Sequence, residues 1–233
     1  MITIIPAADR HFQDFGWLKT YWLFSFASYH DPANIRWGPL RVFNDDIVEP
    51  GQGFPTHPHR EMEIVTILLE GEVTHEDSMG NRTVIKAGEV QRMSAGTGLT
   101  HSEFNLADTR LAFYQIWIFP GTRGLEPSYD QKHFDPSLWA GEIYPVASGQ
   151  GHEGAVSFHA DAAIYRSSLD VGAAVEFEAG DTRKVFVYVT SGSVDINGVA
   201  VNTKDQARIS EETALAIRAV DEAELILVDV PSR

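Results

Sequence analysis

The 233-residue chain contains no cysteine. Disulfide frameworks, thiolate metal sites, iron–sulfur clusters and cysteine nucleophiles are therefore excluded, and any metal must be held by His, Asp or Glu. Basic residues are also scarce, because 18 Lys and Arg stand against 33 Asp and Glu, giving a formal net charge of −15 at pH 7. Such a charge repels phosphate backbones and anionic lipid surfaces, so we expect no direct contact with nucleic acid.

Long apolar runs are missing as well. No segment approaches the roughly 18 consecutive apolar residues that a membrane-spanning helix requires. The N-terminus shows neither a basic segment nor a small-residue cleavage site. The sequence therefore predicts a mature cytoplasmic protein that does not enter a membrane, and its 43% hydrophobic and 22% charged residues are typical of a globular chain.

Helix-period patterns are scarce, whereas short β-rich runs separated by glycine and turn residues recur about every ten positions. This spacing favours an all-β sandwich or barrel. Asn197-Gly198 predicts a type I′ hairpin turn, which needs positive φ at both central residues, and Gly80-Asn81 is expected to form a similar turn. The expected strands are Ile64–Leu69, Glu72–Glu76, Arg82–Ile85, Leu111–Phe119, Ala174–Phe177, Val185–Thr190 and Ser193–Ile196.

The two halves of the chain share a pattern. IVTILLEGEVTHED, from Ile64, aligns with VFVYVTSGSVDING, from Val185, and places Gly71 over Gly192 at an offset of 121 residues. The match indicates an internal duplication, although two unrelated hairpins of one β domain can imitate it. The Gly- and Pro-rich segment 120–154 is then the connection between the halves. We expect an N-terminal barrel over residues 1–125, and a linker plus a C-terminal barrel over residues 126–233.

The strongest chemical signal lies in GQGFPTHPHREMEIVTILLEG, which begins at residue 51. Because side chains alternate faces along a strand, His57 and His59 point the same way, and so do His101 and Glu103. Two neighbouring strands can then bring three neutral nitrogens and one carboxylate together inside a barrel. A single histidine on a strand is usually an ordinary polar residue, but the pairing of HPH with HSE favours a metal site. These donors suit Fe, Mn, Co, Ni, Cu or Zn, and on an octahedral ion they leave two positions for substrate and O₂.

The same segments resemble the two motifs of the cupin superfamily, G(x)5HxH(x)3–4E(x)6G and G(x)5PxG(x)2H(x)3N. The first has one extra residue before its last glycine here, and the second has serine in place of proline and two extra residues before the histidine. More narrowly, HPHREMEIVTILLEGEVTHEDSMGN and SAGTGLTHSEFN resemble the pirin family, including its bacterial quercetin-dioxygenase-like members. The matching cupin positions are Gly51, His57, His59, Glu63 and Gly71 in the first motif, and Gly88, Gly96, His101 and Asn105 in the second.

This resemblance implies a bicupin, two β-barrels packed face to face, with one divalent transition metal in the N-terminal barrel and iron as the first candidate. The family's ligands fall on His57, His59, His101 and Glu103. The general cupin motif nominates Glu63 as the carboxylate instead; we favour Glu103 and expect Glu63 to support a ligating imidazole. At the offset of 121 residues the C-terminal half has no HxH, so we expect no metal there. The family also implies a monomer.

The resemblance further implies a metal-dependent dioxygenase that opens the central ring of a flavonol such as quercetin with O₂ and releases carbon monoxide. In that reaction the ion acts as a Lewis acid on the flavonol hydroxyl, and Glu103 is the catalytic group that accepts its proton. Two alternatives stay open: a metal-binding regulatory sensor that acts through protein partners, as pirins are also known to do, and another cupin enzyme such as an isomerase. A pocket on the order of several hundred Å³ over the metal favours the flavonol enzyme over the sensor.

Other residues receive simpler interpretations. His75, in VTHEDS, is expected to be an ordinary surface histidine. The aromatic run Phe12–Trp22–Phe26 is expected to form core and a barrel lid. The candidate apolar walls of the pocket are Phe54, Met62, Met93 and Phe104.

Overall fold

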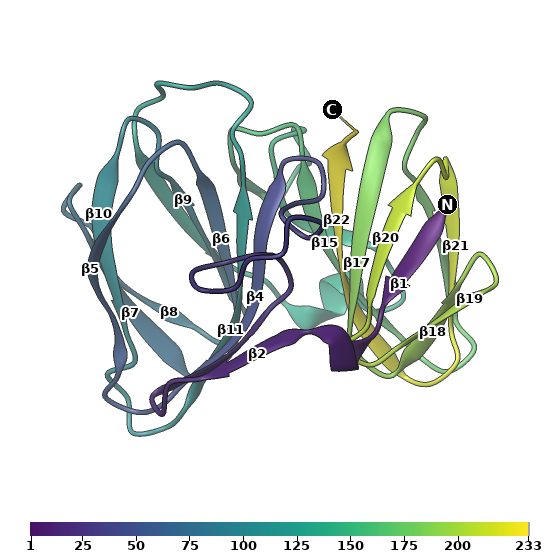
Figure 1. The fold of residues 1–233 in the computed structure, drawn as a ribbon, viewed down its shortest axis with the longest axis horizontal. Helices are drawn as coiled ribbons and strands as arrows, with labels where there is room; N and C mark the ends of the chain where they lie inside the picture. Colours follow the sequence, from purple (N-terminus) through teal and green to yellow (C-terminus); the bar gives the residue numbers. More distant parts are fainter. Residues whose placement is uncertain (233) are drawn as a thin grey trace.

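The computed structural model describes residues 1–232. The chain forms two β-barrels that stand side by side (Figure 1). Each barrel consists of a seven-stranded sheet and a four-stranded sheet. Two short 3₁₀ helices, η1 (Ala7–Asp9) and η2 (Pro136–Trp139), are the only helices among residues 1–232. The all-β, two-barrel architecture predicted from the sequence is confirmed.

The N-terminal barrel is built from antiparallel strands. Its large sheet has the order β12 (Ser128–His133), β9 (Glu89–Ser94), β6 (Glu63–Glu70), β11 (Leu111–Ile118), β4 (Leu40–Val48), β3 (Leu18–Trp22), β2 (His11–Asp14). Its small sheet has the order β5 (Gly53–His59), β10 (Leu99–Phe104), β7 (Glu72–Asp77), β8 (Arg82–Lys86).

The C-terminal barrel repeats this arrangement. Its large sheet has the order β1 (Ile2–Ile5), β20 (Gln206–Ser210), β17 (Arg183–Ser191), β22 (Ala223–Pro231), β15 (Ala163–Leu169), β13 (Tyr144–Ser148), β14 (Val156–Ser157). Its small sheet has the order β16 (Ala174–Glu178), β21 (Ala214–Ala219), β18 (Ser193–Ile196), β19 (Val199–Asn202). The order β9–β6–β11–β4 thus corresponds to β20–β17–β22–β15, which confirms the predicted duplication.

The aligned glycines occupy equivalent turns, between β6 and β7 and between β17 and β18. Gly71 has φ +77° and Gly192 has φ +72°, in the left-handed region that favours glycine. A Cβ atom would meet a backbone oxygen at 2.5 Å in the first turn and at 2.0 Å in the second. The shared glycine is therefore required by the close approach of the neighbouring chain.

The two halves exchange one strand each. β1, at the N-terminus, pairs with β20 in the C-terminal barrel, with Ile2 opposite Ile209 (Figure 1). β12 pairs with β9 in the N-terminal barrel, with Tyr129 opposite Met93. The expected boundary between residues 1–125 and 126–233 therefore differs from the observed sheets for two strands, because β1 pairs in the C-terminal barrel and β12 in the N-terminal barrel.

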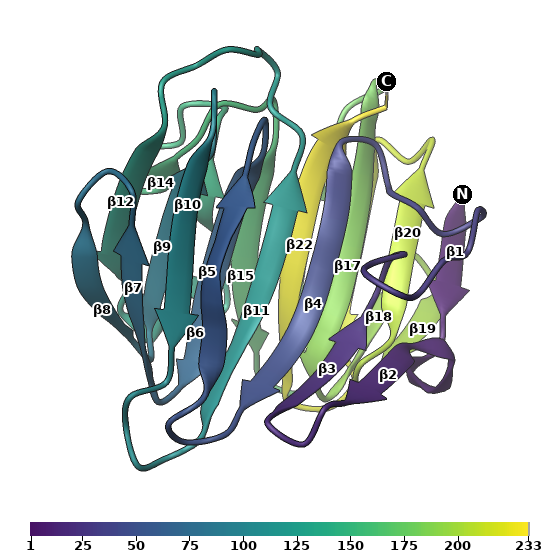
Figure 2. The same ribbon diagram turned by 60° about the vertical axis from the view of Figure 1, so that its left-hand side comes forward.

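The large sheets of the two barrels pack against each other, and Figure 2 shows β4 and β11 lying next to β17 and β22. At the centre of this interface the ring of Phe43 lies 5.3 Å from the ring of Phe186 and 5.1 Å from the ring of Tyr188. Because both faces of β6 and β17 are covered, their sequences read as nearly continuous apolar runs.

The interiors of the two barrels differ. Aliphatic side chains such as Val185, Val187 and Leu227 fill the C-terminal barrel. The N-terminal barrel holds two smaller apolar clusters together with buried polar residues, including His101 and Glu103. Most of the buried polar side chains therefore lie in the N-terminal barrel.

Most local expectations hold, and one turn differs. Each expected strand is present with ends within two residues of those predicted. Asn197 and Gly198 have φ of 49° and 83°, so the first predicted hairpin turn is confirmed. The Gly80-Asn81 prediction is wrong, because a four-residue connection over 78–81 joins β7 to β8 and only Gly80 has positive φ. Within residues 1–232, neither helix has the length and apolar character needed to cross a bilayer.

Candidate metal centre

The HPH and HSE segments lie on the paired strands β5 and β10. Their antiparallel register places His57 directly opposite His101 and His59 opposite Leu99. The two strands approach closely at Gly53, where a Cβ atom would meet Glu103 O at 2.2 Å. The register therefore brings the two predicted histidine segments to one place.

Three imidazoles converge there. The Nε2 atom of His101 lies 3.1 Å from the Nε2 atom of His57. Donor nitrogens of these residues and of His59 all lie within 4.8 Å of one another. The Nδ1 atom of His57 lies 2.8 Å from Pro55 O, so Nδ1 donates its hydrogen and Nε2 keeps a lone pair. Two ligand atoms at about 2.1 Å from one ion, at about a right angle, are about 3 Å apart; the observed spacing fits a shared ion.

Glu103 lies on β10, two residues after His101. Its side chain is 3% exposed, and Gln115 Nε2 donates a hydrogen bond of 3.1 Å to Oε2. Within residues 1–232, Oε1 has no hydrogen-bond partner. Glu103 forms a second group of donor atoms within 4.8 Å with His75 and His101, separate from the group of His57, His59 and His101. Burial, opposed by the hydrogen bond from Gln115, raises the pKa of Glu103 to about 7.

The surface prediction for His75 is wrong, because its side chain is completely buried. Its Nε2 atom lies 3.1 Å from Asp77 Oδ2, and its Nδ1 atom lies 3.0 Å from Gln91 Nε2 and 3.5 Å from His101 Nδ1. Asp77 thus accepts a hydrogen from His75 Nε2, and the lone pair of His75 Nδ1 accepts one from Gln91 Nε2. Carboxylate partners of this kind fix the tautomer of metal-ligating histidines. The available signal was Val73, a buried apolar residue that shares the strand face of His75.

Burial keeps these histidines neutral. Together with the adjacent His57, burial lowers the pKa of His59 to about 4. Burial and the neighbouring imidazoles lower the pKa of His101 to about 2, and burial also lowers the pKa of His75. Neutral imidazole is the form that binds a transition metal.

Glu63 lies on β6, outside both groups of donor atoms. Its side chain is 2% exposed, and Ser94 Oγ donates a hydrogen bond of 2.6 Å to Oε2. Arg92 Nη1 donates in turn to Ser94 Oγ at 3.4 Å. Glu63 therefore belongs to a buried polar network of β6 and β9.

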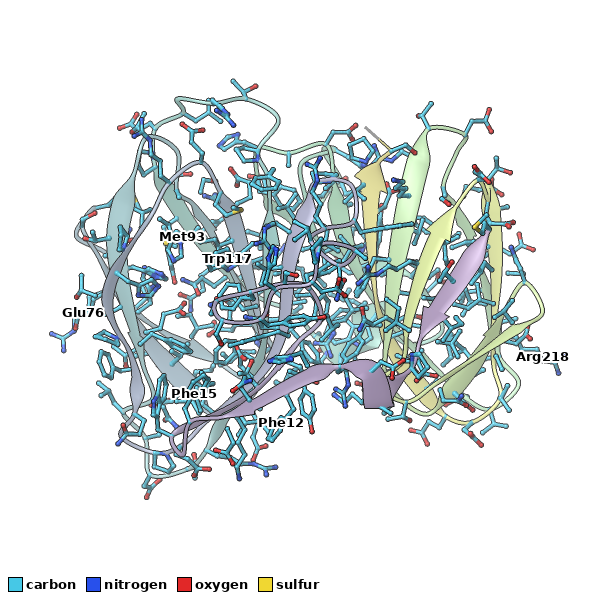
Figure 3. All side chains as sticks on the ribbon, viewed as in Figure 1. Phe12, Phe15, Glu76, Met93, Trp117 and Arg218 are labelled. Atoms are coloured by element: carbon cyan, nitrogen blue, oxygen red, sulfur yellow. The ribbon has the colours of Figure 1, made fainter. Side chains whose placement is uncertain are left out.

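A cavity of about 310 Å³ opens onto two of the three convergent histidines. Its walls include the aromatic side chains of two Trp and two Phe residues, and the ring of Trp117 stands edge-on to His59 at 4.8 Å between centroids. Figure 3 shows Trp117 and Met93 pointing into the N-terminal barrel. The lining residues are Leu18, Trp22, Phe26, Asn44, Asp46, Phe54, Pro55, Thr56, His57, His59, Gln115 and Trp117.

The aromatic expectations need correction. Trp22 and Phe26 line the cavity instead of forming only core and lid, and Phe12 is 46% exposed on the outside of β2 (Figure 3). Of the four candidate wall residues, Phe54 alone lines the cavity. It turns inward because β5 carries one extra residue relative to β10 between His57 and Phe54, which reverses the alternation of side chains.

The other three candidate wall residues lie elsewhere. Met62 and Met93 pack in a small apolar cluster with Ile64 and Leu99. Phe104 lies beside an outer depression formed with Thr74 and Leu106, among other residues. The cavity walls therefore come from β3, β4 and β11 as well as from the β5 residues that precede His57 in sequence.

The donor atoms fit a first-row transition ion. The Nε2 atoms of His57 and His101 face one another at 3.1 Å, and Glu103, which carries an unpartnered carboxylate oxygen, groups with His101. Nitrogen and oxygen donors without sulfur suit several such ions. Two barrels with this group of donors in one of them define a metal-binding bicupin.

Comparison with known proteins agrees with this class. The family model described as Pirin matches residues 6–118, and the model described as Quercetinase C-terminal cupin domain matches residues 145–230. The chain is 43% identical over 232 residues to a quercetin 2,3-dioxygenase of Escherichia coli K12, covering 99% of each protein. A pirin-like protein of Caulobacter vibrioides is 42% identical over 217 residues, covering 93% of this chain and 94% of that protein.

A solved structure agrees in detail. The crystal structure of the bacterial pirin YhhW from Escherichia coli in complex with nickel(II) is 41% identical, covers 100% of both chains and superposes with a TM-score of 0.94. This chain belongs to the pirin family of cupin proteins.

Proposed function

We propose that this protein is a metal-dependent dioxygenase of the quercetin 2,3-dioxygenase type. The observation that carries the proposal is the cavity of about 310 Å³, lined by aromatic side chains and by His57 and His59. A sensor with a sealed or flat metal site has no need of such a space, whereas a planar polyphenol requires it. The name of the Escherichia coli relative supports the same activity.

We assign the metal to His57, His59, His101 and Glu103, with one divalent transition ion per chain. The spacing of the imidazole nitrogens and the unpartnered Oε1 atom of Glu103 support this set. Iron, expected from the family resemblance, and nickel, the ion named with the Escherichia coli structure, are the first ions to test. Glu63, expected to support a ligating imidazole, is instead bonded to Ser94 and is not included in this set.

The bound ion supplies Lewis acidity that lowers the pKa of the flavonol hydroxyl. Glu103 would shift from metal ligand to base and accept the hydroxyl proton at Oε1, while the hydrogen bond from Gln115 holds Oε2. Trp22, Phe26 and Trp117 surround the substrate and exclude water.

The overall reaction balances with one O₂. The two carbon–carbon bonds beside the hydroxyl-bearing carbon break, and that carbon leaves with its oxygen as carbon monoxide. Both atoms of O₂ remain in the product, one in the new ester and one in the new carboxylate. The substrates are therefore a small aromatic molecule and O₂.

We further propose that the protein acts as a cytoplasmic monomer without direct nucleic-acid contact. The net charge of −15 supports the last point, because it opposes binding to phosphate backbones. The regulatory alternative keeps the same ligands and acts through protein partners, and a cupin isomerase shares every ligand named here. Both predict metal binding without loss of flavonol.

The test is aerobic turnover of quercetin by protein reconstituted separately with Fe, Mn, Co, Ni and Cu. Loss of flavonol absorbance with at least one metal, and none with metal-treated His57→Ala, is the expected result. Full metal occupancy without flavonol loss contradicts the proposal and favours the sensor or a different substrate.

A further inference from the structure

One wall of the cavity carries buried polar groups that the proposed chemistry does not use. Asn44 and Asp46 lie two residues apart on β4, so their side chains share one face of the strand. Both are 3% exposed, and both line the cavity. One oxygen of each, Asn44 Oδ1 and Asp46 Oδ1, has no hydrogen-bond partner among the residues described. Buried polar atoms are nearly always paired, so two neighbouring exceptions call for an explanation.

The neighbouring strands offer few polar groups to these two oxygens. Asn44 is flanked by Trp22 on β3 and by Gln115 on β11. The amide of Gln115 is already engaged, because Nε2 donates to Glu103 and Oε1 accepts from Trp117 Nε1 at 3.2 Å. Asp46 lies between Phe113 on β11, which has no polar side-chain atom, and Thr20 on β3, whose buried Oγ1 atom also has no hydrogen-bond partner among the residues described. The two free oxygens therefore face a cavity with several aromatic side chains in its walls.

Asn44 Oδ1 is a hydrogen-bond acceptor, and Asp46 is an acceptor only above about pH 7, because burial raises its pKa to about 7. Above that pH a ligand that completes both oxygens must bring donors. A hydroxyl group on an aromatic ring provides one without adding charge. A carboxylate or phosphate at this end is disfavoured by Asp46 and by the nearby Glu103. The metal ligands lie on β5 and β10, whereas these oxygens lie on β4 of the facing sheet, so a ligand must span the cavity to reach both.

We propose that Asn44 and Asp46 form a subsite that binds a second hydroxyl group of the aromatic substrate, separate from the hydroxyl that the metal binds. The inference rests on the proposed function and adds to it the substrate class: planar aromatic compounds with a hydroxyl at each end. A methyl ether or a hydrogen in the distal position leaves both oxygens unpaired, at a cost in affinity.

The test measures dissociation constants of the nickel-loaded protein for quercetin and for 3-hydroxyflavone, which lacks the additional hydroxyls, under argon so that no turnover occurs. Wild-type protein is expected to bind quercetin about tenfold more tightly, the value of one good hydrogen bond. In Asp46→Leu, which removes the acceptor at similar volume, the ratio is expected to fall towards one. Asn44→Leu provides an independent second variant.

Two results separate the possible failures. If wild-type protein binds both flavonols tightly with equal dissociation constants, the subsite is overturned while the proposed function stands. The same follows if Asp46→Leu and Asn44→Leu leave the ratio of the two dissociation constants unchanged. Absence of binding of either flavonol to the nickel-loaded wild-type protein overturns the proposed function itself. Wild-type affinity for quercetin methylated on its distal hydroxyls gives the same comparison without any variant, and unchanged affinity overturns the subsite.

Discussion

The Nε2 atom of His101 lies 3.1 Å from the Nε2 atom of His57 across the β5–β10 pair. The hydrogen bond from His57 Nδ1 to Pro55 O leaves no hydrogen on His57 Nε2. His101 Nδ1 faces His75 Nδ1 at 3.5 Å. With the hydrogen of His101 on Nδ1, both Nε2 atoms would direct lone pairs to one position, where a metal ion can bind them.

Replacing His57 by Ala should therefore reduce the metal content from one ion per chain to nearly none. The matched control is His159→Ala, which changes an exposed histidine of the C-terminal half and should keep one ion. Metal is measured by elemental analysis after dialysis, with circular dichroism to show that the β-structure is kept. A full complement of metal in His57→Ala would place the site elsewhere.

Replacing each of the two carboxyl groups by an amide, in separate variants, tests which one acts in the reaction. Glu103→Gln should lower turnover about a hundredfold, because the amide cannot accept the substrate proton. Glu63→Gln should lower it far less, since Glu63 lies outside the donor groups and is bonded to Ser94. Steady-state rates on quercetin with equal metal loading make the comparison. The reverse order would assign the carboxylate role to Glu63.

Metal binding should release a proton from Glu103. Burial raises the pKa of its carboxyl to about 7, so below about pH 7 the metal-free protein carries a proton there that the ion must displace. The affinity for nickel therefore falls as pH falls below about 7. At pH 6, titration calorimetry in buffers of different ionisation enthalpy should find about one more proton released by wild-type protein than by Glu103→Gln. Equal proton release would contradict metal binding to Oε1.

The buried pair of Asp77 and His75 should strengthen metal binding through His101. Burial raises the pKa of Asp77, but hydrogen bonds from Asn81 and His75 outweigh it and hold that pKa below its usual value, so Asp77 is a carboxylate. Asp77→Asn should weaken nickel affinity by about tenfold, as loss of such partners typically does. Glu76→Gln, the same change on an exposed neighbour, is the control, and equal affinities of the two variants would contradict the role of His75.

Local patterns in the sequence predicted much of this molecule. Strand alternation put His57 with His59 and His101 with Glu103, and the aligned glycines Gly71 and Gly192 predicted the second barrel. The alternation rule gave the wrong face for Phe54, because β5 has one extra residue between Phe54 and His57, which turns Phe54 to the opposite face. No residue type in the sequence predicts such a bulge.

Long-range pairing was the other limit of prediction. The exchange of β1 and β12 between barrels depends on contacts between residues far apart in the chain, which local patterns do not encode. The cavity residues Asn44, Asp46 and Gln115 were missed for the same reason, since each becomes relevant only when β4 and β11 close the barrel.

The central claim is cleavage of a flavonol by O₂ at this metal centre, and the carbon monoxide released per quercetin consumed tests it most directly. Gas-phase analysis of the headspace is combined with absorbance, using the most active metal form and metal-loaded His159→Ala and His57→Ala as positive and negative controls. The account predicts one carbon monoxide per quercetin in wild-type protein and in His159→Ala, and neither product nor quercetin loss above background in His57→Ala. Bleaching of quercetin without carbon monoxide would contradict it.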